Sequence, residues 1–290
     1  MIKTEIKCIQ CLVGNAVNAV EMMAADPAVR EKMVKHLLKE IAEFDCSLPP
    51  TAMARKILEY TSAMTGVTDP YLTQKDESTR LAKIMLKHFM EEGKYDFSDF
   101  ETLVRFAIAG NIIDYGVNCN LNMDHASSVI QEAFRKKIDM EALRKAETAI
   151  DRAGKILYLL DNCGEAVFDS LLVRKYQKKI TLSVKGKPIL NDVTRRELKD
   201  SGFDGFPAKI VDTGDCTPGV SLKDSSEEFL QAYRECDLIV SKGQGNFETL
   251  IGTEKPVVFL FMAKCGIVAD YLKTEKNTFQ IVCRNLDRIR

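Results

Sequence analysis

Short apolar segments and amphipathic segments alternate through the second half of the chain, and this alternation constrains the fold more than any other feature. From about residue 154 onward, runs rich in β-forming residues predict strands at 155–160, 179–184, 208–212, 237–240, 255–262 and 278–283. The segments between them predict helices at 165–177, 193–202, 225–236, 246–251 and 266–274. Strands that alternate with helices form a mostly parallel sheet with helices on both faces, so we predict an α/β fold.

The first half of the chain has a different pattern, in which apolar residues recur at helical spacing. In the segment 31–44, Met33, Leu37 and Ile41 lie on one stripe, and the segments 78–92 and 139–150 repeat this pattern. Strand-like runs are nearly absent before residue 150. We therefore predict a mostly helical domain over residues 1–150 and an α/β domain over residues 151–290.

Polar residues follow the predicted strands at the points where the strands end. Right-handed crossovers place the carboxyl ends of parallel strands at one edge of the sheet, where ligands bind. Aspartate and asparagine also cap helices and form turns, but their recurrence with lysine at five strand ends favours a shared site. These residues are Asp161 and Asn162, Asn191 and Asp192, Asp212, Lys242, and Lys264.

The residue types at this edge suit phosphoryl chemistry. Carboxylate and amide oxygens are hard ligands for Mg²⁺, Mn²⁺ or a related divalent ion. The segment SKGQGN at 241–246 adds an ammonium group and a glycine-rich turn, whose backbone N–H groups can face an anion. A metal ion polarises phosphoryl oxygens, and lysines neutralise the charge that develops on the transferred group.

Composition argues against several other classes of protein. The 41 Lys and Arg residues nearly balance the 42 Asp and Glu residues, which gives no support for nucleic-acid binding. No uninterrupted apolar run reaches the roughly 18 residues of a membrane span. The segment MIKTEIKCIQC lacks the features of a secretory signal, and the nine cysteines are scattered. We therefore expect a cytoplasmic protein with reduced thiols.

Other catalytic motifs are missing, and one short motif is left open. The chain has no G-x-G-x-x-G after its first strand, no G-x-x-x-x-G-K-[ST] and no G-x-S-x-G. Its three histidines lie in the helical half, so no Ser/His/Asp triad can form at the sheet edge. Cys8 and Cys11 form a single C-x-x-C, for which simple packing and a metal or redox role are both open.

Five segments together resemble the DUF89 family, the ARMT1-like, metal-dependent damage-control phosphatases. The resemblance covers nearly the whole chain, and the N-terminal C-x-x-C resembles the prokaryotic subfamily. It implies a helical N-terminal region, a Rossmann-like three-layer α/β/α domain, and hydrolysis of phosphomonoesters of small metabolites, such as sugar phosphates or damaged phosphometabolites. The segments are GNIIDYG (110–116), LLDNCGE (159–165), VKGKPILNDVT (184–194), DLIVSKGQGNFETL (237–250) and FMAKCGIVA (261–269).

The same resemblance implies roles for individual residues. Asp161, Asn162 and Asp192 would hold one divalent ion, which could be Mg²⁺, Mn²⁺, Co²⁺ or Ni²⁺. Asp161, Lys242 and Lys264 would be the catalytic residues. The substrate would be bound by Asn111, Asp114, Glu165, Lys242, Gly243, Gly245, Asn246 and Lys264.

Three questions stay open at this level. The nucleophile is either a metal-activated water or Asp161 itself. The family was once associated with carboxyl methylation, so a methyltransferase that uses S-adenosylmethionine is an alternative. A non-catalytic binding protein for phosphate ligands is another. Neither alternative explains the Asp-Asn and Asp set as well as a metal-dependent phosphatase does.

Overall fold

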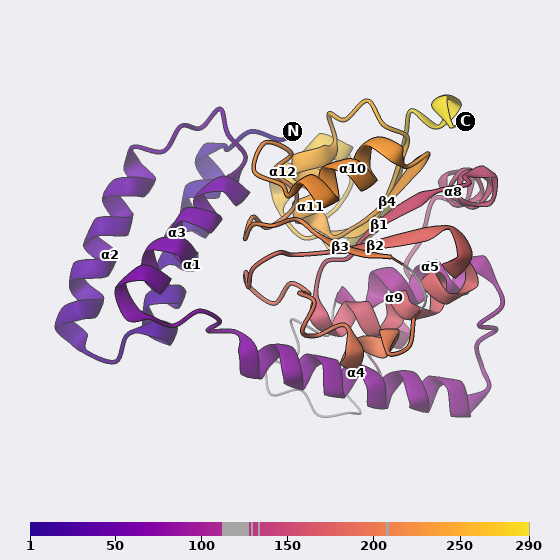
Figure 1. Ribbon diagram of the computed structural model, residues 1–290, viewed down its shortest axis with the longest axis horizontal. Coiled ribbons are helices and arrows are strands. Elements are labelled where there is room, and N and C mark those ends of the chain that lie inside the picture. The colour runs from indigo at the N-terminus through magenta and orange to yellow at the C-terminus, as the bar shows by residue number, and fades with distance from the viewer. Residues whose placement is uncertain (112–127, 129, 133, 207–208, 290) are drawn as a thin grey trace.

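The fold is built around a six-stranded sheet with the strand order β3-β2-β1-β4-β5-β6. The computed structural model describes residues 1–111, 128, 130–132, 134–206 and 209–289 (Figure 1). Strands β1 to β5 pair in parallel, and β6 pairs antiparallel with β5. The strands are β1 (Ile156–Leu159), β2 (Ile180–Val184), β3 (Ile210–Asp212), β4 (Leu238–Lys242), β5 (Val257–Ala263) and β6 (Thr278–Arg284).

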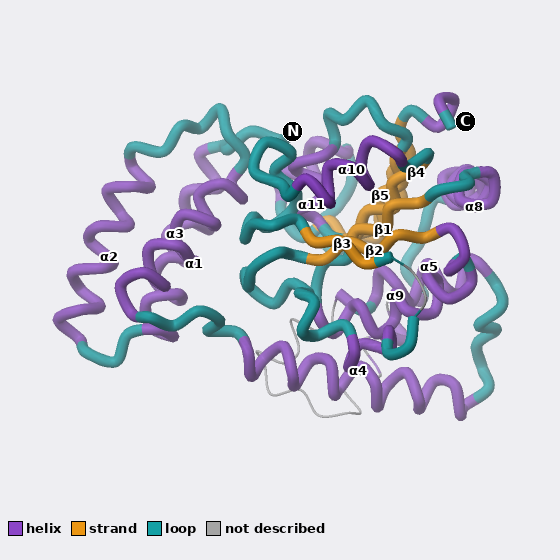
Figure 2. The backbone as a smooth tube through the Cα atoms, in the orientation of Figure 1, coloured by secondary structure: helices purple, strands orange, loops and turns teal. Residues whose placement is uncertain are grey.

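Helices cover both faces of this sheet, which confirms the predicted α/β fold (Figure 2). The helices are α1 (Ile6–Met23), α2 (Pro27–Ala42), α3 (Pro50–Thr65), α4 (Leu72–Glu92), α5 (Phe100–Ala109), α8 (Met140–Arg152), α9 (Cys163–Lys175), α10 (Glu227–Glu235), α11 (Gln244–Leu250) and α12 (Gly266–Leu272). Short helical turns are η1 (Gln177–Lys179), η2 (Lys199–Phe203) and η3 (Leu286–Arg288). Among the described residues, no helix is long and apolar enough to cross a membrane.

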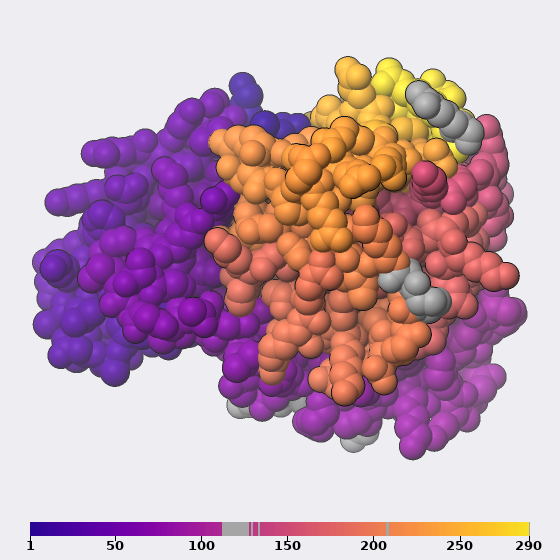
Figure 3. All heavy atoms as spheres, viewed as in Figure 1, coloured from indigo at the N-terminus to yellow at the C-terminus, as the bar shows by residue number. Residues whose placement is uncertain are grey.

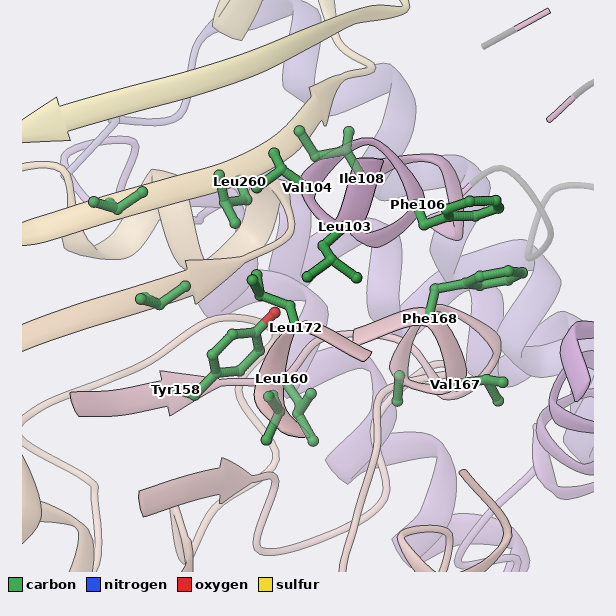
Figure 4. Close-up of a cluster of buried hydrophobic side chains, with 14 of the residues drawn as sticks. Leu103, Val104, Phe106, Ile108, Tyr158, Leu160, Val167, Phe168, Leu172 and Leu260 are labelled. Carbon is green, nitrogen blue, oxygen red and sulfur yellow. The ribbon is translucent and has the colours of Figure 1, made fainter. Parts of the chain in front are cut away.

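Alternate residues of the strands belong to two different cores. On one face, Tyr158 and Leu160 pack with α5 and α9, as Figure 4 shows. The same core includes apolar residues of α4 and α8. On the other face, Leu157 and Leu159 pack with residues of α10, α11 and α12. This division follows from the period of two in a strand, which sends successive side chains to opposite faces.

The first three helices form a separate bundle beside the sheet (Figures 1 and 3). Leu12, Met33 and Met53 are among the residues of its own hydrophobic core. A smaller cluster joins this bundle to the loop after β2, through Leu58 of α3 and Ile189. The helices after residue 70 instead share a core with the sheet, so the change of pattern near residue 150 is not a boundary between cores. The division into domains 1–150 and 151–290 stays a prediction.

One predicted helix is wrong. The segment 193–202 forms turns and the short π-helical η2 rather than a regular α-helix. Gly202 has a φ of 88°, a left-handed conformation that interrupts a right-handed helix. Leu198 and Phe203 are nevertheless buried in the core beneath the sheet, so the apolar spacing in this segment reflects packing in an irregular turn.

Candidate functional site

The loop after β2 folds back across the end of β1 and brings two parts of the predicted metal set together. The Val193 amide donates to the Asp161 carbonyl at 2.8 Å, and the Cys163 amide donates to the Asn191 carbonyl at 3.0 Å. Asn162 and Asp192 form an isolated antiparallel bridge. Backbone hydrogen bonds therefore fix Asp192 beside Asp161 and Asn162, although about thirty residues separate them in sequence.

The three side chains form a buried group of oxygen atoms. Asn162 Nδ2 donates to Asp161 Oδ2 at 3.0 Å and to Glu165 Oε2 at 3.1 Å, which leaves Asn162 Oδ1 as the atom that a cation would use. Asp192 Oδ2 is buried and has no hydrogen-bond partner. The Lys185 ammonium lies 3.5 Å from this oxygen, at the long limit of a hydrogen bond, so the oxygen can still accept a further cation or water.

Burial and like charge act together on the two carboxyl groups. The pKa of Asp161 is raised well above its usual range, first by burial and then by the charges of Asp192 and Glu165. Burial also raises the pKa of Asp192. Two adjacent carboxylates that resist ionisation together are stabilised when a cation binds between them.

A glycine makes room for one of these carboxylates. Gly243, between β4 and α11, has a φ of 78°, which favours glycine. A Cβ atom at this position would lie within 2.6 Å of both carboxylate oxygens of Asp161. The turn therefore packs directly against the Asp161 side chain, at the point between β1 and β4 where the strand order reverses. Ligands bind at such points in open α/β sheets.

The donor set fits one hard divalent ion. It consists of the carboxylates of Asp161 and Asp192 and the amide oxygen of Asn162, with an unbonded oxygen on Asp192. Among the described residues, no three His, Cys, Asp or Glu side chains gather into a metal-binding group. The amide and the substrate or water would thus have to complete the coordination. The assignment of these three residues as metal ligands stays a prediction.

Lys185 is a cation at this site that sequence analysis did not single out. Its Nζ lies 3.5 Å from Asp192 Oδ2 and 3.5 Å from Asn246 Oδ1, and it also donates to the Gly219 carbonyl. Only 2% of the residue is exposed. Lys185 comes directly after the last residue of β2, where the period of a strand no longer predicts the direction of a side chain.

Lys242 lies deeper than expected. Its ammonium group donates to the Ala107 carbonyl at 2.7 Å, contacts Asp169 Oδ1 at 2.9 Å and donates to Glu165 Oε1. Burial lowers the pKa of Lys242, but these two carboxylates outweigh burial and leave it raised. All three ammonium hydrogens thus have acceptors inside the protein. In this structure Lys242 thus lies beneath the carboxylate group and contacts Glu165, and its assignment as a catalytic and substrate-binding residue stays a prediction.

Glu165 is the centre of this buried network. Its Oε2 accepts from Asn111 Nδ2 at 2.7 Å and from Asn162, while its Oε1 accepts from Lys242. Glu165 and Asn111 are buried, so in this structure they support the carboxylate group from beneath. Asp114, which was predicted with Asn111 to bind substrate, lies outside the described residues.

The predicted substrate loop ties the strand ends together. Asn246 Nδ2 donates to the Lys242 carbonyl at 2.8 Å and to the Leu160 carbonyl at 3.4 Å. Gly245 packs against Gly219 of the neighbouring loop, where a Cβ on Gly219 would collide with the Gly245 carbonyl. Asn246 is buried in this structure, and its assignment as a substrate-binding residue stays a prediction. The backbone N–H groups at the start of α11 remain as donors that could face an anion.

Lys264 is the half-buried lysine at the end of β5. Its charge lowers the pKa of Asp161, opposing the effects of burial and of the other carboxylates. Its backbone amide is bound by Gln244 of α11 at 2.8 Å. The Lys264 ammonium therefore acts electrostatically on Asp161, and the assignment of Lys264 as a catalytic and substrate-binding residue stays a prediction.

Cys8 and Cys11 lie in the first turns of α1. Cys8 is buried and Cys11 is exposed, and the eight cysteines in the described part of the chain are all free thiols. Burial raises the pKa of Cys8 above that of an ordinary thiol. A raised pKa disfavours the reactive thiolate, so Cys8 behaves as a packing residue in this structure. The connection to the prokaryotic subfamily stays a prediction.

Comparison with known proteins places this arrangement in a family. The family model of the damage-control phosphatase ARMT1-like domain matches residues 4–278. The chain belongs to this family. The ARMT1-like match spans the helical bundle as well as the sheet, so both parts are features of the family.

Relatives and a solved structure agree with this assignment. Damage-control phosphatase PH1575 of Pyrococcus horikoshii is 32% identical over 97% of this chain and 97% of its own length. A damage-control phosphatase of Archaeoglobus fulgidus is 32% identical over 90% of this chain and 92% of its own. The crystal structure of a DUF89 family protein from Pyrococcus horikoshii matches with a TM-score of 0.88 and 30% identity, and covers 98% of this chain and 100% of that one. The predicted family is thereby confirmed.

Proposed function

We propose that this protein is a metal-dependent phosphatase that hydrolyses phosphomonoesters of small metabolites, such as sugar phosphates or damaged phosphometabolites. The observation that carries the proposal is the buried group of Asp161, Asn162 and Asp192, in which Asp192 Oδ2 makes no hydrogen bond and has the Lys185 ammonium 3.5 Å away. Membership of the ARMT1-like family and relatives named damage-control phosphatases support the same activity.

The three residues would hold one ion of Mg²⁺, Mn²⁺, Co²⁺ or Ni²⁺. Such an ion, when bound, neutralises phosphoryl oxygens and lowers the pKa of water. The protein contributes the fixed positions of the ligands, because the backbone bonds between 161–163 and 191–193 hold both segments in place. The Asn162 side chain is held in turn by Glu165, whose other oxygen is bound by Lys242.

The protein's own positive groups would bind the substrate phosphate. Lys264 would contact the phosphoryl oxygens, and the backbone amides of Gly245 and Asn246 would face the same group. Lys185 would stabilise Asp192 as a carboxylate, because its ammonium lies 3.5 Å away. These groups are already oriented by the fold, so they need no rearrangement as charge develops on the phosphoryl oxygens.

Asp161 has two possible roles in this scheme. As a ligand it would hold the ion and orient an attacking water. As a nucleophile its carboxylate would form a phospho-aspartyl group and release the alcohol, and water would then cleave that group and release phosphate. Trapping of a phosphorylated Asp161 by rapid acid quenching and mass spectrometry would decide for the covalent route.

The test is phosphate release by metal-stripped protein from p-nitrophenyl phosphate and a panel of sugar phosphates. Mg²⁺, Mn²⁺, Co²⁺ and Ni²⁺ are added back separately, and Asp192→Asn is measured beside the wild type. This substitution keeps the shape of the side chain and removes its charge. We expect metal-dependent release that falls by at least roughly 100-fold in Asp192→Asn, as for the loss of one electrostatic contributor at an active site. Equal turnover in both proteins would contradict the site.

Two alternative functions predict different results in the same assay. A methyltransferase would show no phosphate release and would bind S-adenosylmethionine. That ligand is cationic, so the lysines at this edge would have no clear use. A non-catalytic phosphate-binding protein would bind the sugar phosphates without turnover. It would gain little from the two adjacent carboxylates, which repel an anion when no metal is present.

A further inference from the structure

Gln244, the first residue of α11, connects the two turns that meet at the candidate site. Its Oε1 accepts hydrogen bonds from the backbone amides of Lys264 at 2.8 Å and Cys265 at 3.2 Å. Its Nε2 donates to Glu248 Oε1 at 2.8 Å. The Gln244 side chain therefore accepts from two consecutive backbone amides after β5. Glu248, one helical turn further along α11, holds the Gln244 side chain in place.

Two backbone amides and Glu248 together determine which way the Gln244 side-chain amide points. An amide group can be rotated to exchange its oxygen and nitrogen, and nearby partners decide between the two orientations. The backbone amides of Lys264 and Cys265 can only donate hydrogen bonds, so they must face Oε1. Nε2 is then directed at Glu248 Oε1, which accepts its hydrogen bond. The three partners thus select a single orientation of Gln244.

Glu248 is itself fixed in a protected position. It is 7% exposed, and its backbone carbonyl accepts the amide of Ile2 at 2.7 Å. The start of the chain therefore lies against this part of α11, and Figure 1 shows the N-terminus close to α11 and α12. Cys8 packs in the hydrophobic core that contains Phe247 and Leu250 of α11. Burial raises the pKa of the Cys8 thiol, and the nearby Glu248 adds to this effect. A hydrogen bond shielded from water in this way is stronger than an exposed one.

The position of this pair relates it to the chemistry at the carboxylate group. Gly243, next to Gln244, packs against Asp161, and Lys264 carries the charge that acts on the same aspartate. Gln244 is bonded to the backbone of Lys264 itself. It therefore sets the distance between the turn at 243–246 and the turn at 263–265, the two elements that would hold the substrate phosphate from two sides.

We propose that Gln244 and Glu248 are positioning residues for Lys264. The inference rests on the proposed function, in which Lys264 contacts the phosphate. Loss of the bridge frees two amides and lets the turn after β5 move, so Lys264 no longer meets the phosphoryl group at a fixed place. A displacement of about 1 Å at such a contact costs up to roughly 100-fold in rate.

A pair of substitutions that exchanges the two side chains tests this directly. Gln244→Glu alone places two carboxyl groups about 3 Å apart, so above the raised pKa of Glu248, about 7, like charges repel and kcat should fall about tenfold or more. In the double variant Gln244→Glu with Glu248→Gln, the carboxylate at position 244 accepts from the two backbone amides. The side-chain amide at position 248 donates to that carboxylate, so the number of hydrogen bonds is restored. We expect it to recover most of the wild-type kcat. Gln244→Ala removes the bridge and should lower kcat more than it changes KM for p-nitrophenyl phosphate.

A second measurement reports on the turn after β5 and does not depend on catalysis. Hydrogen exchange of the Lys264 and Cys265 amides should be faster in Gln244→Ala than in the wild type, because their acceptor is gone. The matched control is Gln231→Ala. Gln231 makes the same contact with a glutamate four residues on, Nε2 to Glu235 Oε1 at 2.9 Å, but on the exposed surface of α10. This control should leave both kcat and the exchange of these amides unchanged.

The outcomes separate the two proposals. Unchanged exchange in Gln244→Ala, or faster exchange with wild-type kcat, would overturn the positioning role. Failure of the double variant to recover activity, with its fold intact by circular dichroism, would also overturn it. If the wild-type protein releases no phosphate with any of the four metals, the proposed function fails. Exchange at Lys264 and Cys265 would then still decide whether Gln244 holds the turn.

Discussion

A single hydrogen atom at position 243 determines how closely the chain can approach the Asp161 carboxylate. Gly243→Ala would place a methyl group within 2.6 Å of both of its oxygens, at a φ of 78°. We expect Asp161 to rotate away, with at least roughly 100-fold loss of metal-dependent phosphate release. The matched control is Gly66→Ala, at a φ of 75° with open space around it. Both variants should lose about 1–2 kcal/mol of stability from the backbone conformation. Only Gly243→Ala should lose turnover, and equal turnover in the two would contradict the packing argument.

Glu248 should make the stability of the protein depend on pH. Burial raises the pKa of Glu248 to about 7, against a partly compensating hydrogen bond from Gln244. As the pH rises, the folded state therefore keeps the proton after the unfolded state has lost it. The contribution of Glu248 to the free energy of unfolding is full below its ordinary pKa and is lost as the pH rises through about 7. We expect Glu248→Gln to gain stability relative to wild type between pH 5 and pH 8, by up to about 3 kcal/mol.

Urea unfolding of both proteins across this pH range measures the effect. Glu235→Gln is the control, because Glu235 accepts the same type of glutamine hydrogen bond on an exposed helix. The gain in stability with rising pH should be larger for Glu248→Gln than for Glu235→Gln. An equal gain in the two variants would show that Glu248 is not held in its protonated form by burial.

At the scale of elements, β4 carries a lysine on the face that the core covers. Lys242 has the same parity as Leu238 and Val240, which pack in the core with α5 and α9. The period of two therefore predicts that Lys242 points inward. The sequence analysis grouped Lys242 with the polar residues at the strand ends and did not use this pattern. The buried carboxyl groups of Glu165 and Asp169 and the hydroxyl of Tyr158 complete its network.

The two lysines at the strand ends should respond differently to substitution. Lys242→Met leaves Glu165 and Asp169 buried without their cation, which should cost about 3–5 kcal/mol of stability. Lys264→Met, at a half-buried position, should cost about 1 kcal/mol or less while it removes most of the turnover. Urea unfolding and phosphate release of both variants measure this contrast. A Lys242→Met protein as stable as Lys264→Met would contradict the buried network.

At the scale of the whole molecule, the helical bundle is attached to the edge of the sheet that carries the candidate site. Arg55 of α3 lies 3.1 Å from Asp224 Oδ2 and 3.4 Å from Asp215 Oδ2 in the loop after β3. Apolar contacts of Leu58 with Ile189 and Cys216 accompany this link. The bundle is thus attached to the loops that follow β2 and β3, including the loop that carries Asp192. It therefore lies beside the candidate site, where under the proposed function it would select the organic part of the substrate.

Much of this architecture follows from patterns in the sequence, and the remainder depends on distant contacts. Alternation of strands and helices predicted the parallel sheet and placed Asp161 and Asp192 at one edge. The depth of a side chain below that edge has no local signal, so the burial of Glu165 and Asn246 and the role of Lys185 were not predicted. The irregular segment 193–202 was also missed, because its apolar spacing is the same as that of a helix.

The most direct test of the metal-dependent site is the position of a bound ion. Crystals of the protein soaked with Mn²⁺ and inorganic phosphate, measured at the manganese absorption edge, locate the metal by anomalous scattering. We predict one peak between the side chains of Asp161, Asn162 and Asp192, with phosphate between it and Lys264. A peak elsewhere, or none at these residues in crystals of active protein, would contradict the account.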